Sequence, residues 1–191
     1  GGPGTGKTTI IKCIIEILSQ HNQKFMLLAP TGRASKRMSD ATGYEAKTIH
    51  RALEVAQGDM ASISRFVHNE NNPFKTNCVI VDEMSMVDVA LMHHLCKALP
   101  RDCKLILVGD KDQLASVGAG NVLDDILTSG IIKVAMLTKI FRQNEDSLII
   151  TNAHLINEGK MPIINNSCKD FFFEEKTDTG SIKQSIVDMV T

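Results

Sequence analysis

Gly1-Gly2-Pro3-Gly4-Thr5-Gly6-Lys7-Thr8-Thr9 opens the chain, and this stretch decides the fold. It contains the pattern G-x-x-x-x-G-K-T, which is typical of a phosphate-binding loop between a β-strand and an α-helix. No residue precedes the loop in the 191-residue sequence, so we expect the strand that leads into it to lie outside these residues. The loop predicts an α/β fold that handles a nucleoside triphosphate.

Each residue type in this loop suits a bound triphosphate. Glycines allow backbone conformations that other residues avoid, and they bring N–H groups close to phosphate oxygens. The helix that follows adds its positive N-terminal end. We expect Lys7 to reach the β- and γ-phosphates and the Thr8 hydroxyl to bind Mg²⁺. The alternative is a Gly-rich turn that arose by chance. The predicted nucleotide-binding residues are Gly2, Pro3, Gly4, Thr5, Gly6, Lys7, Thr8 and Thr9.

The composition says more about the cellular location of the protein than about its function. The net charge is −1, so any contact with nucleic acid must come from local basic patches. Five cysteines form neither a C-x-x-C pair nor a zinc-binding spacing, which favours reduced thiols and a cytoplasmic protein. No stretch has the length or flanks of a signal peptide or a transmembrane helix, so we expect no membrane partner.

Short apolar strands alternate with helices along the chain. Strands are predicted at 24–29, 78–81, 104–108 and 134–137, and helices at 8–20, 33–41, 48–56, 89–99, 120–128 and 147–157. A polar, irregular loop is expected at 58–77, and a linker at 162–169 precedes a Phe-rich strand and one more helix. This alternation predicts a mostly parallel sheet with helices on both faces.

A carboxylate pair, Asp82 and Glu83, follows the buried strand at 78–81. Ligands of open α/β sheets bind beyond the C-terminal ends of the strands. We therefore assign Asp82 to Mg²⁺ and Glu83 to orienting and deprotonating the attacking water. A solvated pair of acidic residues at a strand end is the alternative.

Two further side chains follow later strands. Gln113 comes after the strand at 104–108, and its amide could sense a γ-phosphate. A polar turn between strand and helix is an equally good interpretation. Arg142 follows the strand at 134–137, where a guanidinium could stabilise transition-state charge. A surface arginine is the alternative there.

Six segments in order resemble the motifs of superfamily-one DNA helicases, and their residues are most similar to those of the RecD/TraA branch. The resemblance extends from residue 1 to about residue 159 and includes 116–123 and 153–159 as further similar stretches. Ala115 departs from it, because many relatives have proline there. The six segments are the loop at 1–8, Ala29-Pro30-Thr31-Gly32-Arg33-Ala34, Thr48-Ile49-His50, Asp82-Glu83-Met84-Ser85, Gly109-Asp110-Lys111-Asp112-Gln113-Leu114 and Phe141-Arg142-Gln143.

The resemblance implies a RecA-like P-loop ATPase that uses ATP and Mg²⁺ to move 5′ to 3′ along single-stranded DNA. It also implies that Gln113 is the γ-phosphate sensor and Arg142 an arginine finger. For Thr31 and Thr48, helix N-capping is a compatible alternative, and His50 could be an ordinary core or surface histidine. The residues that correspond to DNA contacts are Pro30, Thr31, Gly32, Arg33, Thr48, His50, Ser116 and Val117.

The resemblance also implies a domain division. Residues 1–161 correspond to a first motor domain without its first strand, and 162–191 to a linker and the start of a second motor domain. The adenine-reading segment and most of the second domain are not in this sequence, so we expect these 191 residues alone not to unwind DNA. Possible partners are subunits of a recombination and repair nuclease complex of the exodeoxyribonuclease V type. The alternatives are a P-loop ATPase switch and a nucleotide-gated DNA-binding subunit without unwinding activity.

Overall fold

The structure is a computed structural model that describes residues 1–55, 66–138, 147–164 and 170–190. The chain divides into two compact units, Gly1–Phe141 and Arg142–Thr191. This division does not test the domain boundary expected near residue 161, which stays a prediction. Among the described helices, none is both long enough and apolar enough to cross a membrane.

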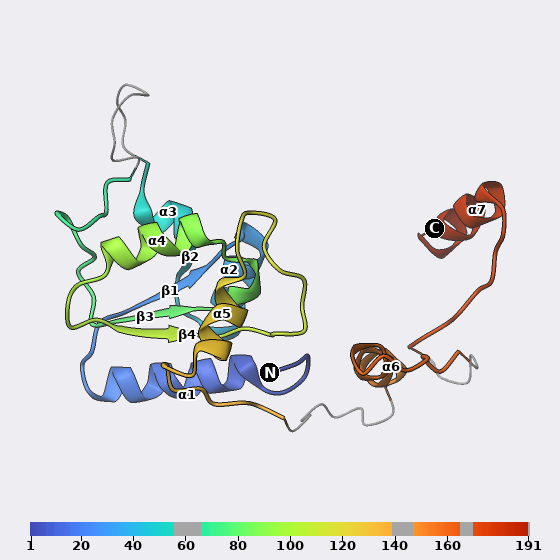
Figure 1. Cartoon of the computed structure of the whole chain (residues 1–191), viewed down its shortest axis with the longest axis horizontal. Coiled ribbons are helices and arrows are strands. Elements are labelled where there is room, and N and C mark those ends of the chain that lie inside the picture. Colours follow the sequence, from blue (N-terminus) through green and yellow to red (C-terminus); the bar gives the residue numbers. More distant parts are fainter. Residues whose placement is uncertain (56–65, 139–146, 165–169, 191) are drawn as a thin grey trace. The chain divides into compact units, whose positions relative to one another are not determined.

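The first unit is built on a parallel four-stranded sheet (Figure 1). The strands are β1 (Phe25–Ala29), β2 (Ala46–Thr48), β3 (Cys78–Val81) and β4 (Lys104–Leu107), and their order is β2-β1-β3-β4. Leu28 pairs with Val81, and Val81 pairs with Leu107. Because the strands are parallel and end in register, the loops that follow β1, β3 and β4 all leave the same edge of the sheet.

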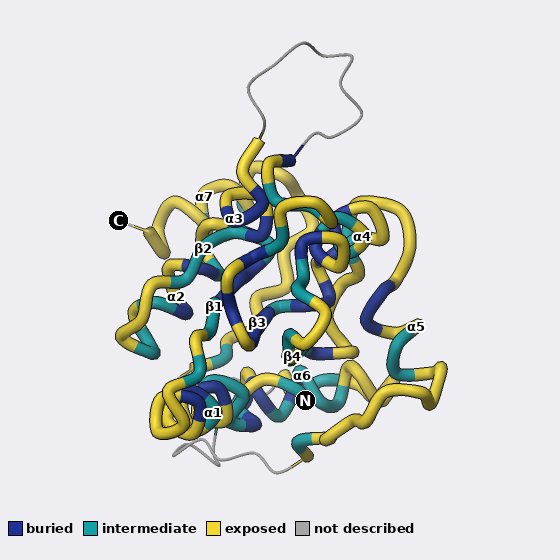
Figure 2. The backbone as a smooth tube through the Cα atoms, turned by 90° about the vertical axis from the view of Figure 1, so that its left-hand side faces the viewer, coloured by how far each residue is buried: buried dark blue, intermediate teal, exposed yellow. Residues whose placement is uncertain are grey.

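Both faces of the sheet are covered, because successive residues of β3 pack alternately into two different apolar clusters. All four residues of β3 are buried. Cys78 and Ile80 belong to one apolar cluster with side chains of α1 (Lys7–Gln20) and α2 (Gly32–Thr42). Val79 and Val81 belong to a second cluster with α3 (Ile49–Leu53), α4 (Val89–Ala98) and α5 (Val122–Ser129). Figure 1 shows α1 and α4 on opposite sides of the sheet, and Figure 2 shows buried residues in β1 and β3 and in the helices that cover them.

Helix α1 follows the phosphate-binding loop because its apolar residues recur at helical spacing. Ile11, Ile15 and Leu18 are buried against the sheet, and full burial of each such side chain is worth about 1.5–3 kcal/mol. The helix ends where the His21 N–H bonds to the Ile17 carbonyl oxygen. This packing fixes the direction from which α1 presents its N-terminus to the loop.

The predicted strand at 134–137 is wrong, because these residues have no strand conformation. A cavity of about 460 Å³ lies between this segment and β4, and both line it together with α5. Paired strands lie only about 4.7–4.9 Å apart, so the segment cannot join the ladder across this space.

Two other expected elements also differ. The helix predicted at 48–56 is shorter: β2 takes up residues 46–48 by pairing with β1, and α3 stops before Glu54, whose φ is 53°. The loop predicted at 58–77 is partly outside the described residues, and 66–77 is irregular.

The described residues of the second unit form two helices, α6 (Leu148–Asn157) and α7 (Thr179–Val190). Asn152 is 1% exposed, and its amide bonds to the backbone of Ile163, accepting at 2.7 Å and donating at 2.9 Å. The expected Phe-rich strand at 171–175 is wrong, since these residues have no strand conformation. The expected linker falls partly on residues that are not described.

Candidate active site

The phosphate-binding loop already has the shape of an anion cradle. Gly4 and Gly6 have φ values of 77° and 85°, in a backbone region that residues with a Cβ rarely adopt. Thr5 is buried, and its hydroxyl donates to the Gly2 carbonyl oxygen at 2.7 Å. No side chain of the described residues caps the first turn of α1, so its N–H groups are available to an anion. The loop therefore fits a phosphate group without rearranging its glycines.

Lys7 lies over this loop and connects it to the segment that follows β4. Its Nζ donates to the carbonyl oxygens of Gly1 at 2.7 Å and Gly2 at 3.0 Å. The same Nζ lies 3.8 Å from Oδ2 of Asp110, and the two side chains are 15% and 2% exposed. The other oxygen of Asp110 accepts the Asp112 N–H at 3.2 Å. The ammonium group is therefore held at the loop by two carbonyls and one buried carboxylate.

Asp82 immediately follows β3, at the same edge of the sheet. Burial raises the pKa of the Asp82 carboxyl above its ordinary value. The Glu83 N–H, which donates to Asp82 Oδ1 at 2.9 Å, and the positive charges of Lys7 and Arg37 act in the opposite direction. A partly buried carboxylate of this kind is stabilised by a cation.

Oxygen donors for a magnesium ion come from two elements. Thr8 is in the first turn of α1, and Asp82 follows β3. Mg²⁺ commonly uses one or two protein ligands and completes its shell with water and phosphate oxygens. Over the described ranges, no three His, Cys, Asp or Glu side chains cluster in a way that could hold a metal on their own. The donor set therefore fits a cation that binds together with a nucleotide.

Glu83 has an unusual conformation for a non-glycine residue. Its φ and ψ are 56° and 44°, and it precedes the short 3₁₀ helix η1 (Met84–Met86). A backbone in this region costs on the order of 1 kcal/mol or more and tends to occur at functional sites. Its Oε2 is buried and, in the described part of the chain, has no hydrogen-bond partner. An acceptor left open in this way suits a water molecule that needs orienting.

The loop after β4 carries Gln113, Ser116 and Val117. Gln113 is exposed, and its backbone N–H donates to the Asp110 carbonyl oxygen at 3.3 Å. Ser116 closes the turn by bonding to the carbonyl oxygens of Gly118 and Gly120. Val117 projects fully into solvent.

Helix α4 holds this turn in place. The Val89 N–H donates to the Ala119 carbonyl oxygen at 3.2 Å. Gly120 has a φ of 92°, and a Cβ there would lie 2.3 Å from Val89 Cγ2. The tight packing requires glycine at this position and fixes where Ser116 and Val117 are presented.

Six of the expected DNA-contacting residues lie at or just after the C-terminal ends of β1 and β2. Thr31 and Thr48 are the N-caps of α2 and α3, where their hydroxyls accept the N–H groups of Ala34 and Arg51. The capping interpretation of both threonines is therefore correct, and it leaves DNA contact as a compatible prediction. Pro30 and Gly32 flank Thr31. Arg33 and His50 are exposed, and the His50 ring lies 6.2 Å from the ring of Phe66.

The structure brings the loop, Lys7, Asp82, Glu83 and Asp110 together at one edge of the sheet. Arg142 lies outside the described residues, so its assignment as an arginine finger stays a prediction. Sequence reasoning missed Arg37, whose Nη1 lies 3.9 Å from Glu83 Oε1. The available signal was its position four residues after Arg33, on the same face of a basic helix.

Known proteins resemble this chain in sequence. It is 38% identical over 163 residues to the ATP-dependent RecD2 DNA helicase of Deinococcus radiodurans, a match that covers 85% of this chain and 22% of that protein. It is 37% identical over 150 residues to the RecBCD enzyme subunit RecD of Mycolicibacterium smegmatis, covering 66% of this chain and 26% of that protein. The chain thus spans about a quarter of the length of these relatives.

Solved structures resemble its fold. Pif1 helicase from Candida albicans superposes with a TM-score of 0.60 at 24% identity and covers 85% of this chain and 40% of that one. Bacteroides Pif1 bound to single-stranded DNA gives a TM-score of 0.54 at 20% identity over 98% of this chain and 51% of that one. These likenesses confirm the expected RecA-like α/β fold. The AAA domain family matches residues 1–119, so the chain belongs to that family, and its likeness to RecD-type helicases confirms the resemblance expected from the motifs.

Proposed function

We propose that the protein is an ATP-dependent DNA helicase and that this chain is part of its first motor domain. The motor hydrolyses ATP with Mg²⁺ and moves 5′ to 3′ along single-stranded DNA. The observation that carries the proposal is the meeting of Lys7, Asp82 and Glu83 at one edge of the sheet. The exposed Arg33 and His50 follow strands that end at the same edge. The names of the RecD-type relatives support this assignment.

Each residue of the loop and the strand ends has a role in this proposal. The loop amides and Lys7 bind the phosphates, and Thr8 and Asp82 hold the magnesium ion, which neutralises charge on the phosphates when bound. Glu83 orients the attacking water and accepts its proton. Gln113 senses the γ-phosphate, and Arg142 stabilises the charge that develops there.

The proposed DNA path follows the ends of β1, β2 and β4. Thr31, Thr48 and backbone N–H groups offer hydrogen bonds to phosphates, and Arg33 offers a charge. His50 and Val117 are exposed and can contact bases. The proposed setting is the cytoplasm, with other subunits of a recombination nuclease complex as possible partners, because one relative is named as a RecBCD subunit.

The test is ATP hydrolysis by the full-length protein with and without single-stranded DNA. Wild-type hydrolysis should rise several-fold with DNA, and Glu83→Gln should keep nucleotide binding but lose turnover. Strand displacement on duplexes with a 5′ or a 3′ tail then checks the direction of movement. The helicase proposal fails if DNA leaves the rate of hydrolysis unchanged. The ATPase switch or nucleotide-gated subunit would then be the better interpretation.

A further inference from the structure

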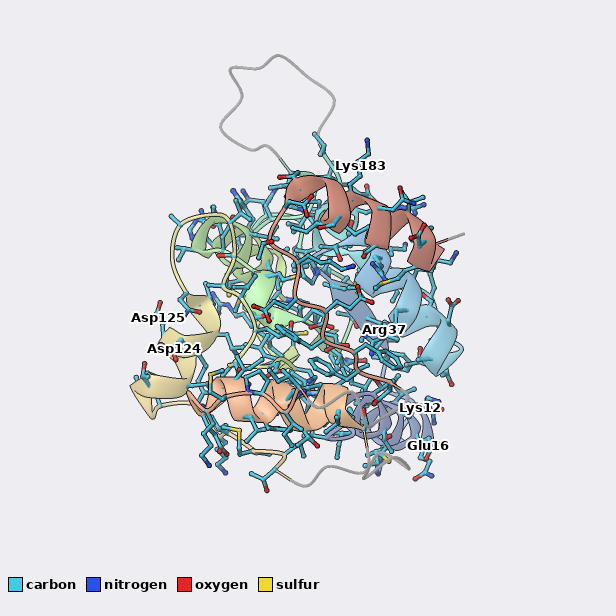
Figure 3. All side chains as sticks on the ribbon, turned by 90° about the vertical axis from the view of Figure 1, so that its right-hand side faces the viewer. Lys12, Glu16, Arg37, Asp124, Asp125 and Lys183 are labelled. Carbon is cyan, nitrogen blue, oxygen red and sulfur yellow. The ribbon has the colours of Figure 1, made fainter. Side chains whose placement is uncertain are left out.

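An ion pair links the candidate water-activating residue to the candidate DNA-binding helix. Arg37 belongs to α2 (Figure 3), and its Nη1 lies 3.9 Å from Oε1 of Glu83. The Arg37 side chain is 75% exposed, whereas that of Glu83 is 20% exposed. A solvent-facing cation therefore contacts a mostly buried carboxylate, and a ligand from solution can reach it.

The position of Arg37 affects which way the Glu83 carboxylate is used. One oxygen, Oε1, faces the guanidinium, and the other, Oε2, has no hydrogen-bond partner within the described residues. A water activator needs a free carboxylate oxygen aimed at the water. While Arg37 attracts Oε1, the carboxylate is drawn toward α2, and this contact sets the direction in which the open Oε2 points.

The surroundings of Arg37 favour a phosphate as its alternative partner. Arg33, Lys36 and Arg37 line a hollow on the surface of α2, together with Asp40 and Ala41. Arg33 and Arg37 are one helical turn apart and share a face. Guanidinium groups bind phosphate oxygens through two parallel hydrogen bonds. An exposed pair at 3.9 Å is weak by comparison.

We propose that Arg37 is a positioning residue that holds Glu83 in an unproductive orientation. This hold ends when a phosphate of single-stranded DNA binds the Arg37 guanidinium in place of the Glu83 carboxylate. The exchange breaks no covalent bond and needs no further reactant. It gives DNA-stimulated hydrolysis a physical cause, since DNA binding releases the carboxylate for the attacking water. This inference rests on the proposed function, because it takes Glu83 as the water activator and DNA as the ligand of α2.

The experiment compares Arg37→Gln with wild type in the full-length protein. Without DNA, the variant should hydrolyse ATP up to about fivefold faster, which is the range that an exposed ion pair can account for. The increase should appear in kcat and not in the KM for ATP. The stimulation by single-stranded DNA should fall by the same factor. Arg37→Lys should restore much of the low basal rate, because it keeps the positive charge.

Arg101→Gln is the matched control. Arg101 is exposed on the turn before β4, at the opposite end of the strands, and the substitution removes the same charge. It should leave both rates as in wild type. A thermal melt of each variant checks that it is folded, and Arg37→Met provides a second neutral variant.

The outcomes separate this inference from the proposed function. If wild type responds to DNA but Arg37→Gln and Arg37→Met keep or lower the basal rate, Arg37 does not restrain Glu83, and the inference is overturned while the helicase proposal stands. If wild type hydrolyses no ATP, or DNA has no effect on it, the proposed function fails. A raised basal rate that Arg37→Lys reverses supports the restraint.

Discussion

Replacing Lys7 by alanine is expected to destabilise the folded chain as well as to remove nucleotide binding. The cause is Asp110, which is 1% exposed and lies 3.8 Å from the Lys7 ammonium. Without Lys7, the Asp110 carboxylate keeps the hydrogen bond from the Asp112 N–H but has lost the positive charge of the ammonium. A buried charge without a counter-charge is unfavourable, so the variant should unfold more easily even when no nucleotide is present.

The geometry gives the size of the effect. At 3.8 Å and an effective dielectric constant of about 20, two unit charges attract by roughly 4 kcal/mol. Removing one partner of a buried pair costs about 3–5 kcal/mol. Because the Lys7 side chain is still 15% exposed, we expect the lower end, about 3 kcal/mol. For a chain of this size, that loss lowers Tm by about 6–12 °C.

The assay is thermal or urea unfolding without nucleotide, with Asp110→Asn as the matched partner. Asp110→Asn alone should change stability little, because Lys7 keeps its bonds to the carbonyls of Gly1 and Gly2. In the double variant, the amide at position 110 carries no charge, so stability should recover most of the loss while nucleotide binding stays absent. The reasoning is refuted if Lys7→Ala is as stable as wild type, or if Asp110→Asn does not rescue it.

Three further changes test other parts of the site. Burial raises the pKa of Asp82, so the folded chain binds the proton of this carboxyl more tightly than the unfolded chain does. The resulting stabilisation of the folded state is complete below the ordinary pKa and is lost as pH rises through the raised value. At pH 7 Asp82→Asn should therefore stabilise the apo chain, by about 0.5–2 kcal/mol; calorimetry should find this gain vanishing toward pH 3, and Mg²⁺-ATP should no longer raise Tm. Thr31→Ala and Thr48→Ala should each cost about 1 kcal/mol in urea unfolding through loss of an N-cap, with serine as the control that keeps the hydroxyl. Gly6→Ala should cost about 1–2 kcal/mol, because a Cβ at a φ of 85° meets no atom within 4 Å but strains the backbone; equal stability to wild type would contradict this.

Much of the fold could be predicted from sequence because its signals are local. The apolar runs at 25–29, 78–81 and 104–107 are strands, and the spacing of Ile11, Ile15 and Leu18 identified α1. The prediction of secondary structure failed where a strand depends on a neighbouring strand for its hydrogen bonds. β2 has only three residues and exists by pairing with β1, whereas the apolar run at 134–137 is separated from β4 by a cavity and pairs with no strand of the described residues. Apolar composition indicates a capacity for strand formation, whereas the ladder requires a neighbour.

The candidate site divides in the same way. Lys7, Asp82 and Glu83 could be predicted because each has a fixed place in a short motif. The contacts of Asp110 with Lys7 and of Arg37 with Glu83 could not be predicted. They depend on the register of the sheet, which places Leu28 beside Val81 and Val81 beside Leu107 at the strand ends. Distances between motifs become available only when the sheet is assembled.

The unfavourable features of the first unit gather where the nucleotide is proposed to bind. Asp82 is a carboxylate with a pKa raised by burial, and Glu83 has a left-handed backbone and a buried oxygen that no described residue pairs with. Each is the kind of local conflict that a fold retains when a ligand relieves it. A magnesium ion would compensate Asp82, a water would satisfy Glu83, and phosphates would replace the carbonyls on Lys7. Nucleotide binding and release would then shift the balance of forces at the strand ends from which the candidate DNA-contacting residues extend, which is the physical requirement for coupling hydrolysis to movement on DNA.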